Sequence, residues 1–172
     1  MVDDKLKFIL DNVNNWLKFN ETKNAALITM VVALIVCCIN LLKESEKIIP
    51  YQYLVWYYLI VLLAVLLRSL WAIFAKLDNY VSYMAPPKEG KENILFYGHI
   101  SYMTEEYFLN KIYEKYTSYK QPYYPTKFQR DLANQIIINS KISMRKANDF
   151  NSSAKILFWS ITVAVIVFCF LA

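Results

Sequence analysis

The sequence predicts an all-α membrane protein: three transmembrane helices, with a small cytosolic helical bundle formed by long helices that extend from the spans. Three observations predict this fold. Hydrophobic residues make up 57% of the 172 positions, more than in a typical soluble domain. Three apolar windows approach the roughly 20 residues that a helix needs to cross a bilayer. Long stretches without proline or glycine lead into the first and third windows.

The three windows are Ala25 to Leu42, Tyr51 to Ala75 and Ile156 to Ala172. The first window follows a mixed-charge helical leader, whereas a signal peptide begins with a short basic segment. We therefore expect all three windows to remain in the mature protein.

The distribution of lysine and arginine predicts the orientation, because basic flanks resist crossing the membrane. Twelve of the 19 basic residues lie between the second and third windows, in residues 76–155. We place this insert and the N-terminus in the cytoplasm, and the C-terminus outside. Trp56 and Trp71, near the two ends of the second window, suit aromatic belts at the two interfaces.

The expected domains follow from these windows. Residues 1–24 form a cytosolic amphipathic arm, and residues 25–75 form two transmembrane helices with a short external loop. Residues 76–153 form a cytosolic domain, and residues 154–172 form the third transmembrane helix.

The arm has its apolar residues at helical spacing: Leu6, Ile9, Leu10, Val13, Trp16 and Leu17. No proline or glycine interrupts the chain from Val2 up to Pro50. We expect the arm and the first span to be one helix.

The insert has two connectors and one short helix. The stretch "APPKEGK", Ala85 to Lys91, predicts a turn, and "YKQPYYPTK", Tyr119 to Lys127, a second connector. Thr104, followed by two glutamates, predicts an N-cap and a helix that ends near Tyr116. Only Ile94 to Tyr97 offers a candidate strand.

A second long helix is predicted from Lys127 to Ala172, where proline and glycine are absent. Its expected apolar stripe comprises Phe128, Leu132, Ile136, Ile138, Ile142 and Phe150. Its expected polar face comprises Arg130, Lys141, Arg145 and Lys146. Because no Gly/Ser-rich linker intervenes, rotation of the cytosolic bundle would move the spans directly.

Catalysis is not expected. Cys37, Cys38 and Cys169 lie within apolar windows and predict buried hydrophobic side chains, so we expect neither a disulfide nor a metal site. His99 is the only histidine, and no nucleophile accompanies it. The two glycines, Gly90 and Gly98, form no phosphate-binding loop. We expect no enzyme, no cofactor and no nucleic-acid partner.

Several short motifs, in their order relative to the windows, resemble the Pycsar membrane effectors. They are "FNETKNAALI" (Phe19 to Ile28), "NILFYGHIS" (Asn93 to Ser101), "TEEYF" (Thr104 to Phe108) and "QIIINSKISMRK" (Gln135 to Lys146). The resemblance covers roughly Phe19 to the end. His99 stands where this family usually has an acid.

The resemblance implies a bacterial antiphage effector in the inner membrane, with residues 76–153 as its sensing domain. A phage-activated cyclase makes cyclic UMP or cyclic CMP, and the effector responds by compromising the membrane. The implied partners are the cyclic nucleotide, the lipid bilayer and further copies of the chain in a homo-oligomer.

A cyclic nucleotide needs a cation for its phosphate, an apolar plate for its base and polar groups for the base edge. Arg145, Lys146, Gln135 and Asn139 are candidates for the cation and the polar edge. Tyr97, Gly98 and His99 are candidates for the plate and for close backbone approach. The alternatives are lipid headgroup contact for Arg145 and Lys146, a capping or packing role for His99, and a simple turn at Gly98.

Arg68 places one charge inside the second window, which is costly at mid-bilayer. It lies about two turns, or ~12 Å, from Lys76, close enough to snorkel toward the cytosolic headgroups. We favour snorkelling, or pairing with Glu21, over a pore-lining role. Asn40 is a candidate for a hydrogen bond between spans.

Two other functions are compatible with the sequence. One is an oligomeric adaptor that holds a soluble partner through its tyrosine-rich insert. The other is a constitutive holin-like pore-forming toxin, which would kill on expression alone.

Overall fold

The computed structural model describes residues 2–44, 49–74, 91–117 and 123–171. The predicted turn at Ala85 to Lys91, apart from its last residue, lies outside these ranges, as does the first part of the connector at Tyr119 to Lys127.

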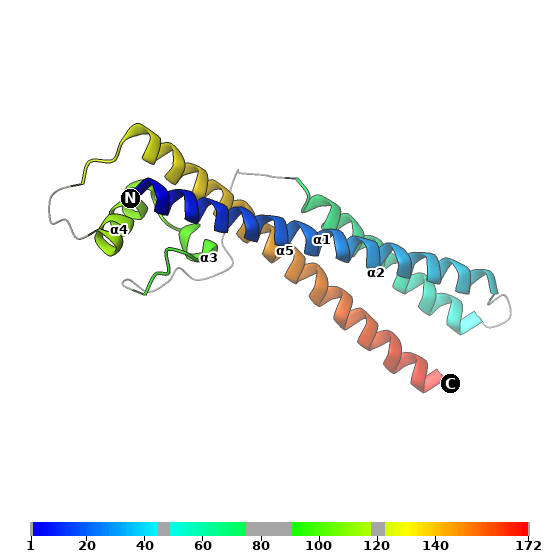
Figure 1. The fold of residues 1–172 in the computed structure, drawn as a ribbon. Coiled ribbons are helices and arrows are strands. Elements are labelled where there is room, and N and C mark those ends of the chain that lie inside the picture. Colours follow the sequence, from blue (N-terminus) through cyan, green and yellow to red (C-terminus); the bar gives the residue numbers. More distant parts are fainter. Residues whose placement is uncertain (1, 45–48, 75–90, 118–122, 172) are drawn as a thin grey trace. The chain divides into compact units, whose positions relative to one another are not determined.

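Five helices make up the described residues, and no strand occurs among them (Figure 1). They are α1 (Val2–Glu44), α2 (Ile49–Trp71), α3 (Tyr97–Ile100), α4 (Glu105–Tyr116) and α5 (Lys127–Leu171). Three of them, α1, α2 and α5, are long and apolar enough to cross a membrane. The predicted all-α fold with three such helices is therefore confirmed.

The candidate strand at Ile94 to Tyr97 is wrong. Ile94 and Leu95 lie in a turn, and Tyr97 begins α3. The Asn93 side chain explains the turn, because its Oδ1 atom accepts a hydrogen bond from the Leu95 backbone at 2.9 Å. Such local bonds compete with strand pairing.

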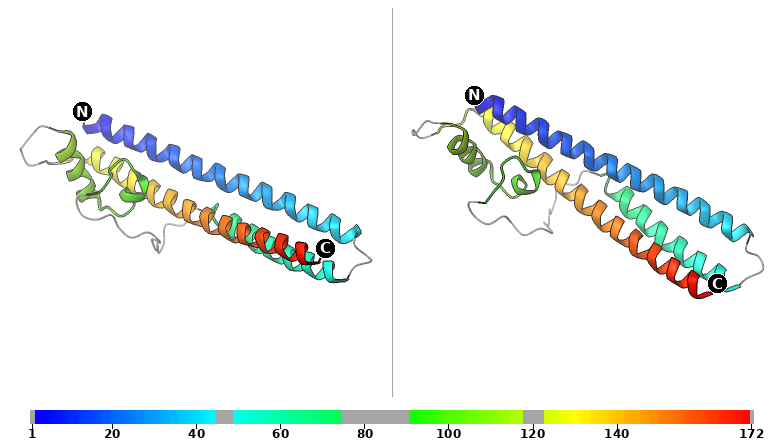
Figure 2. Two further views of the ribbon diagram at one scale, coloured as in Figure 1. Left: turned by 90° about the horizontal axis from the view of Figure 1, so that it is seen from below. Right: turned by 60° about the horizontal axis from the view of Figure 1, so that its bottom comes forward.

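The chain divides into two compact units. Unit 1 comprises Met1–Asn20 and Ala75–Ala147, and unit 2 comprises Glu21–Phe74 and Asn148–Ala172. Both α1 and α5 are continuous helices that contribute residues to both units (Figures 1 and 2).

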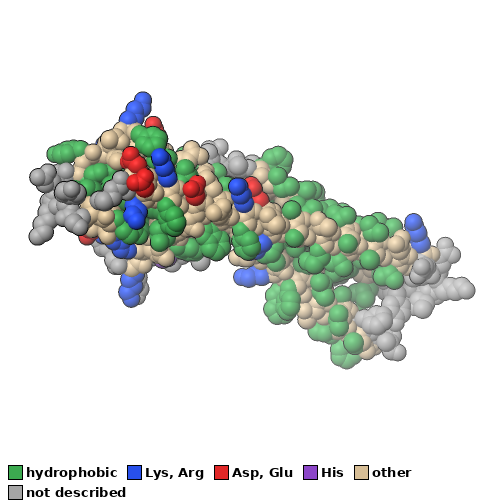
Figure 3. Space-filling view, in the orientation of Figure 1, with side chains coloured by type: hydrophobic (Ala, Val, Ile, Leu, Met, Phe, Trp, Pro, Cys, Tyr) green, Lys and Arg blue, Asp and Glu red, His purple; other side chains and the backbone are tan. Residues whose placement is uncertain are grey.

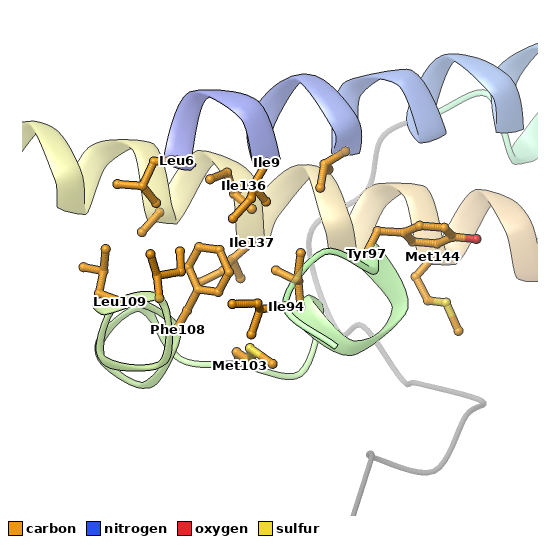
Figure 4. Close-up of a cluster of buried hydrophobic side chains, with 14 residues drawn as sticks. Leu6, Ile9, Ile94, Tyr97, Met103, Phe108, Leu109, Ile136, Ile137 and Met144 are labelled. Atoms are coloured by element: carbon orange, nitrogen blue, oxygen red, sulfur yellow. The ribbon is translucent and has the colours of Figure 1, made fainter. Parts of the chain in front are cut away.

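The core of unit 1 is built from α1, α3, α4 and α5 (Figure 4). Helix α1 contributes Leu6, Ile9 and Val13, three of the residues that the arm's pattern predicts. Phe108 of α4 is fully buried within the same cluster. The predicted N-cap is also present, since Thr104 Oγ1 accepts a hydrogen bond from the Tyr107 backbone, and α4 ends at Tyr116 as expected.

The predicted apolar stripe of α5 is only partly correct. Ile136 is buried, but Phe128 and Ile138 are 51% and 40% exposed. The buried line instead follows steps of three and four residues, which keep one helix face inward: Ala133, Ile136, Ile137, Ser140, Ser143, Met144 and Ala147. Lys146, which the pattern placed on the polar face, is 6% exposed because it follows Ser143 by three residues.

Unit 2 packs α1, α2 and the second half of α5 around a small apolar core. Its buried members are Leu27, Val31, Cys38, Leu59, Leu62, Val65 and Leu157. Large apolar side chains also cover its outside, including Ile60 at 65% and Leu67 at 67% exposed. On the face drawn in Figure 3, hydrophobic side chains dominate unit 2 and charged ones gather over unit 1. An outer surface of this kind suits lipid and is rare in soluble monomers.

Candidate functional site

Tyr97, a candidate plate for a nucleotide base, belongs to the core of unit 1. Its side chain is 8% exposed. Its ring lies 5.5 Å from the ring of Trp16 on α1 and 4.9 Å from the ring of Phe96. The ring of Tyr97 therefore packs against other aromatic rings of the protein. Trp16 is 38% exposed, so its ring is more accessible to a ligand than that of Tyr97.

Gly98 is buried in α3, directly beside an aromatic ring. A Cβ atom at this position would collide with the Phe96 ring, coming within 2.8 Å of its Cζ atom. The missing side chain thus makes room for Phe96, and this contact accounts for the glycine.

His99 holds together the turn that precedes α3. Its Nδ1 atom accepts a hydrogen bond from the Asn93 backbone at 2.8 Å. Its ring meets the Phe96 ring edge-on, with the centroids 5.3 Å apart. In this geometry Nε2 is the nitrogen that remains for any ligand.

The polar residues of α5 differ in their surroundings. Asn139 Nδ2 donates a hydrogen bond to Asn14 Oδ1 on α1 at 2.8 Å, whereas Gln135 is exposed. Arg145 is half-buried and Lys146 is buried. Figure 4 draws Tyr97 and Met144 at the same end of the core cluster. The structure thus brings α3 near the part of α5 that carries Arg145, while Gln135 lies ten residues, or ~15 Å, further along.

A second amide contact between α1 and α5 was missed by the sequence analysis. Asn20 is 2% exposed, and its Nδ2 atom donates to Ser143 Oγ at 2.8 Å and to the Ser143 carbonyl at 3.2 Å. The signal for Asn20 is its spacing, because it follows the buried Leu6 and Val13 at intervals of seven residues and so lies on the same face of α1.

Unit 1 also contains a cavity of about 290 Å³ between α4 and the start of α5, which no motif in the sequence indicates. Glu105, Glu106, Tyr124 and Arg130 are among its lining residues. Arg130 lies 3.8 Å from Glu105. Because two carboxylates face one guanidinium, this cavity is a poor host for a phosphate anion.

Tyr123, another lining residue of this cavity, is held in a hydrogen-bond chain. Its hydroxyl donates to Gln129 Oε1 at 2.7 Å, and Gln129 Nε2 donates to Asp3 Oδ1 at 2.6 Å. Its ring stacks on Tyr113 with the centroids 4.4 Å apart. Burial raises the pKa of Tyr123, and the charge of Asp3 raises it further.

In unit 2, Arg68 lies 3.9 Å from Asp149 on α5, a partner other than the expected Glu21. Lys76, toward which snorkelling was expected, lies outside the described residues. Glu21 is exposed on α1, and so is Asn40. Asp149 is the acidic side chain that the structure places against the span arginine.

Unit 2 also contains several buried polar atoms, two of them on residues next to this ion pair in the sequence. Asn24, Ser69 and Ser153 are at most 3% exposed. Within the described part of the chain, Asn24 Oδ1, Ser69 Oγ, Asn148 Nδ2 and Ser153 Oγ have no hydrogen-bond partner. We call these four residues, with Arg68 and Asp149, the polar layer. The layer draws residues from all three long helices, near the start of the apolar segments of α1 and α5 and near the end of α2. Buried polar groups of this kind favour water over a dry core.

The fold and these contacts define an all-α membrane protein in which a helical core and a three-helix membrane unit share two long helices. The family model described as "Pycsar effector protein domain" matches residues 5–172. The chain therefore belongs to the Pycsar effector family and is an antiphage defence effector. Searches of curated proteins and of solved structures found no match.

Proposed function

We propose that this protein is a non-catalytic effector of the bacterial inner membrane that senses cyclic UMP or cyclic CMP. In this proposal unit 1 lies in the cytoplasm and binds the nucleotide. Binding rearranges the helices of unit 2 within a homo-oligomer, and the membrane loses its integrity. Membership of the Pycsar effector family supports the signalling context.

The observation that carries the proposal is the continuity of α1 and α5, each of which contributes residues to both units. Neither helix contains a glycine or proline. An unbroken helix transmits a rotation or shift along its length, whereas a flexible linker absorbs it. A ligand that changes how α1 meets α5 in unit 1 would thus change the same two helices in unit 2.

Arg145 is the candidate that we favour for the nucleotide phosphate. It is less buried than Lys146. It follows Met144, which lies at the same end of the core cluster as Tyr97 of α3 (Figure 4). A guanidinium offers paired donors to phosphate oxygens. The acidic cavity between α4 and α5 is the less suitable site for an anion.

The polar layer is the feature of unit 2 that suits membrane disruption. A bundle with a uniformly apolar interior excludes water. Here an ion pair and buried amide and hydroxyl groups lie near one end of each apolar segment. Because these groups gain partners when water enters, the layer lowers the cost of hydrating the bundle interior. We propose that helix rearrangement opens a hydrated path at this layer.

Membrane potential in cells tests the proposal. We expect cyclic UMP or cyclic CMP, supplied by a co-expressed cyclase, to depolarise cells that contain the protein. Arg145→Ala should abolish the response without lowering the amount of protein in the membrane. Lys141→Ala, which removes another cation from α5, is the matched control and should respond normally.

Three results would contradict the proposal. Depolarisation on expression alone would indicate a constitutive toxin. A stoichiometric soluble partner, with no potential change under any trigger, would indicate an adaptor. An intact response in Arg145→Ala would remove Arg145 from the site.

A further inference from the structure

A groove runs between α1 and α5 in unit 2, with a volume of about 400 Å³. Ala26, Leu27 and Met30 line it on α1, and Ala154, Leu157 and Ile161 line it on α5. Lys23 and Phe150 close one end, and Lys23 is the single charged residue among its described lining residues. We propose that this groove binds one acyl chain of an anionic phospholipid, with the lipid phosphate at Lys23.

The dimensions of the groove fit a hydrocarbon chain. From Phe150 to Ile161 it follows α5 for eleven residues, or about 17 Å, close to half of the ~30 Å hydrocarbon core. A volume of about 400 Å³ over this length gives a mean cross-section of roughly 24 Å². A single extended hydrocarbon chain has a cross-sectional area of this size. A helix from a second copy, with a diameter of roughly 10 Å, is too wide.

The two alanines explain why a groove exists here. Ala26 on α1 and Ala154 on α5 have the smallest side chains of the groove lining, so the walls are lowest at these positions. A bilayer supplies acyl chains at high local concentration to any such apolar depression within a span.

Lys23 gives the groove its charge preference. Its Nζ atom lies 4.3 Å from the centre of the Phe150 ring, which orients the ammonium group at the end of the groove. An ammonium group has three N–H donors, so it can hold a phosphate oxygen while it keeps other contacts. The acid of the polar layer, Asp149, lies 3.9 Å from Arg68. The ammonium group of Lys23 is therefore the charge that we expect to attract the lipid phosphate.

Native mass spectrometry of the full chain in mild detergent tests this inference, with graded phosphatidylglycerol and phosphatidylcholine as probes. We expect one lipid retained per chain, with phosphatidylglycerol preferred. Lys23→Gln should lower that preference about fivefold, the effect of one basic residue at a membrane surface, while some lipid remains bound. Lys155→Gln, a change of an exposed lysine outside the groove lining, should leave it unchanged.

Filling the groove tests the acyl-chain contact separately. Ala154→Phe should remove retained lipid of both kinds. Ala26→Leu, on an exposed position of α1, should do the same and guards against a folding defect in the first variant. Equal retention of the two lipids by the unaltered chain would overturn the inference. So would unchanged retention in both filled variants, or a filled variant that alters only the oligomeric state. No nucleotide is needed, so failure of the proposed sensing function would leave this result intact.

Discussion

Two asparagines on α1 form hydrogen bonds to α5 within unit 1, and the pattern of apolar residues in α1 does not predict these bonds. Asn14 bonds to Asn139 and the buried Asn20 bonds to Ser143, both on α5. Buried amides that are satisfied fix the register of two helices, because a shifted register would leave them without partners. These contacts therefore make the α1–α5 pairing in unit 1 specific as well as stable.

Asn20→Ala should lower the free energy of unfolding by about 1–3 kcal/mol, because Ser143 Oγ would remain buried without this donor. Thermal unfolding in detergent, followed by circular dichroism, measures the loss. Asn15→Ala, at an exposed position of the same helix, is the control and should change stability by less than about 0.5 kcal/mol. Equal unfolding midpoints for the two variants would show that the amide contact contributes nothing.

Tyr123 should make unit 1 sensitive to alkaline pH. Burial raises the pKa of Tyr123 in the folded protein, so its neutral form is favoured there. Its contribution to stability is fully present below the ordinary tyrosine pKa of about 10, and it is lost as the pH rises through the raised value. We expect the thermal midpoint to fall above about pH 10, and to fall less in Tyr123→Phe.

Tyr124→Phe is the control for this titration, because Tyr124 is 84% exposed. Its alkaline profile should match that of the unaltered protein. If Tyr123→Phe shows the same alkaline fall as the unaltered protein, another group causes it.

At the scale of elements, the long helices and α4 could be predicted from the sequence, whereas the short helix α3 could not. The continuous helices α1 and α5 and the bounds of α4 followed from absent helix breakers and from Thr104. Helix α3 was missed because four residues are too few for helical periodicity to show. The burial of Lys146 could not be predicted. A polar residue at the edge of an apolar stripe becomes buried only if a partner helix covers that edge, and the sequence of α5 alone does not show which edge is covered.

A break in α5 tests whether helix continuity matters. Asn151 is exposed and lies four residues after unit 1 ends. Asn151→Pro removes a helix hydrogen bond and should cost ~3 kcal/mol locally. We expect this variant to reach the membrane and bind the cyclic nucleotide, but to lose depolarisation. Asn151→Ala keeps the helix and should respond; a full response from the proline variant would refute transmission through α5.

At the scale of the whole molecule, the class of protein could be predicted because a bilayer imposes simple length and composition rules. The two units share their two longest helices, and one unit is covered by apolar side chains. The candidate ligand residues were harder to predict. Tyr97 packs against Trp16, a contact that depends on α1 and α3 meeting in three dimensions. Gly98 lies against Phe96, a local contact that depends on the turn before α3.

The most direct test of the account compares inverted and right-side-out membrane vesicles that contain the protein and hold an ion gradient. Cyclic UMP and cyclic CMP are anions that do not cross the bilayer unaided. With unit 1 in the cytoplasm, adding one of them outside should collapse the gradient of inverted vesicles and leave that of right-side-out vesicles intact. Gradients that persist in both preparations, or that collapse without nucleotide, would contradict the claim that unit 1 senses the nucleotide and unit 2 opens the membrane.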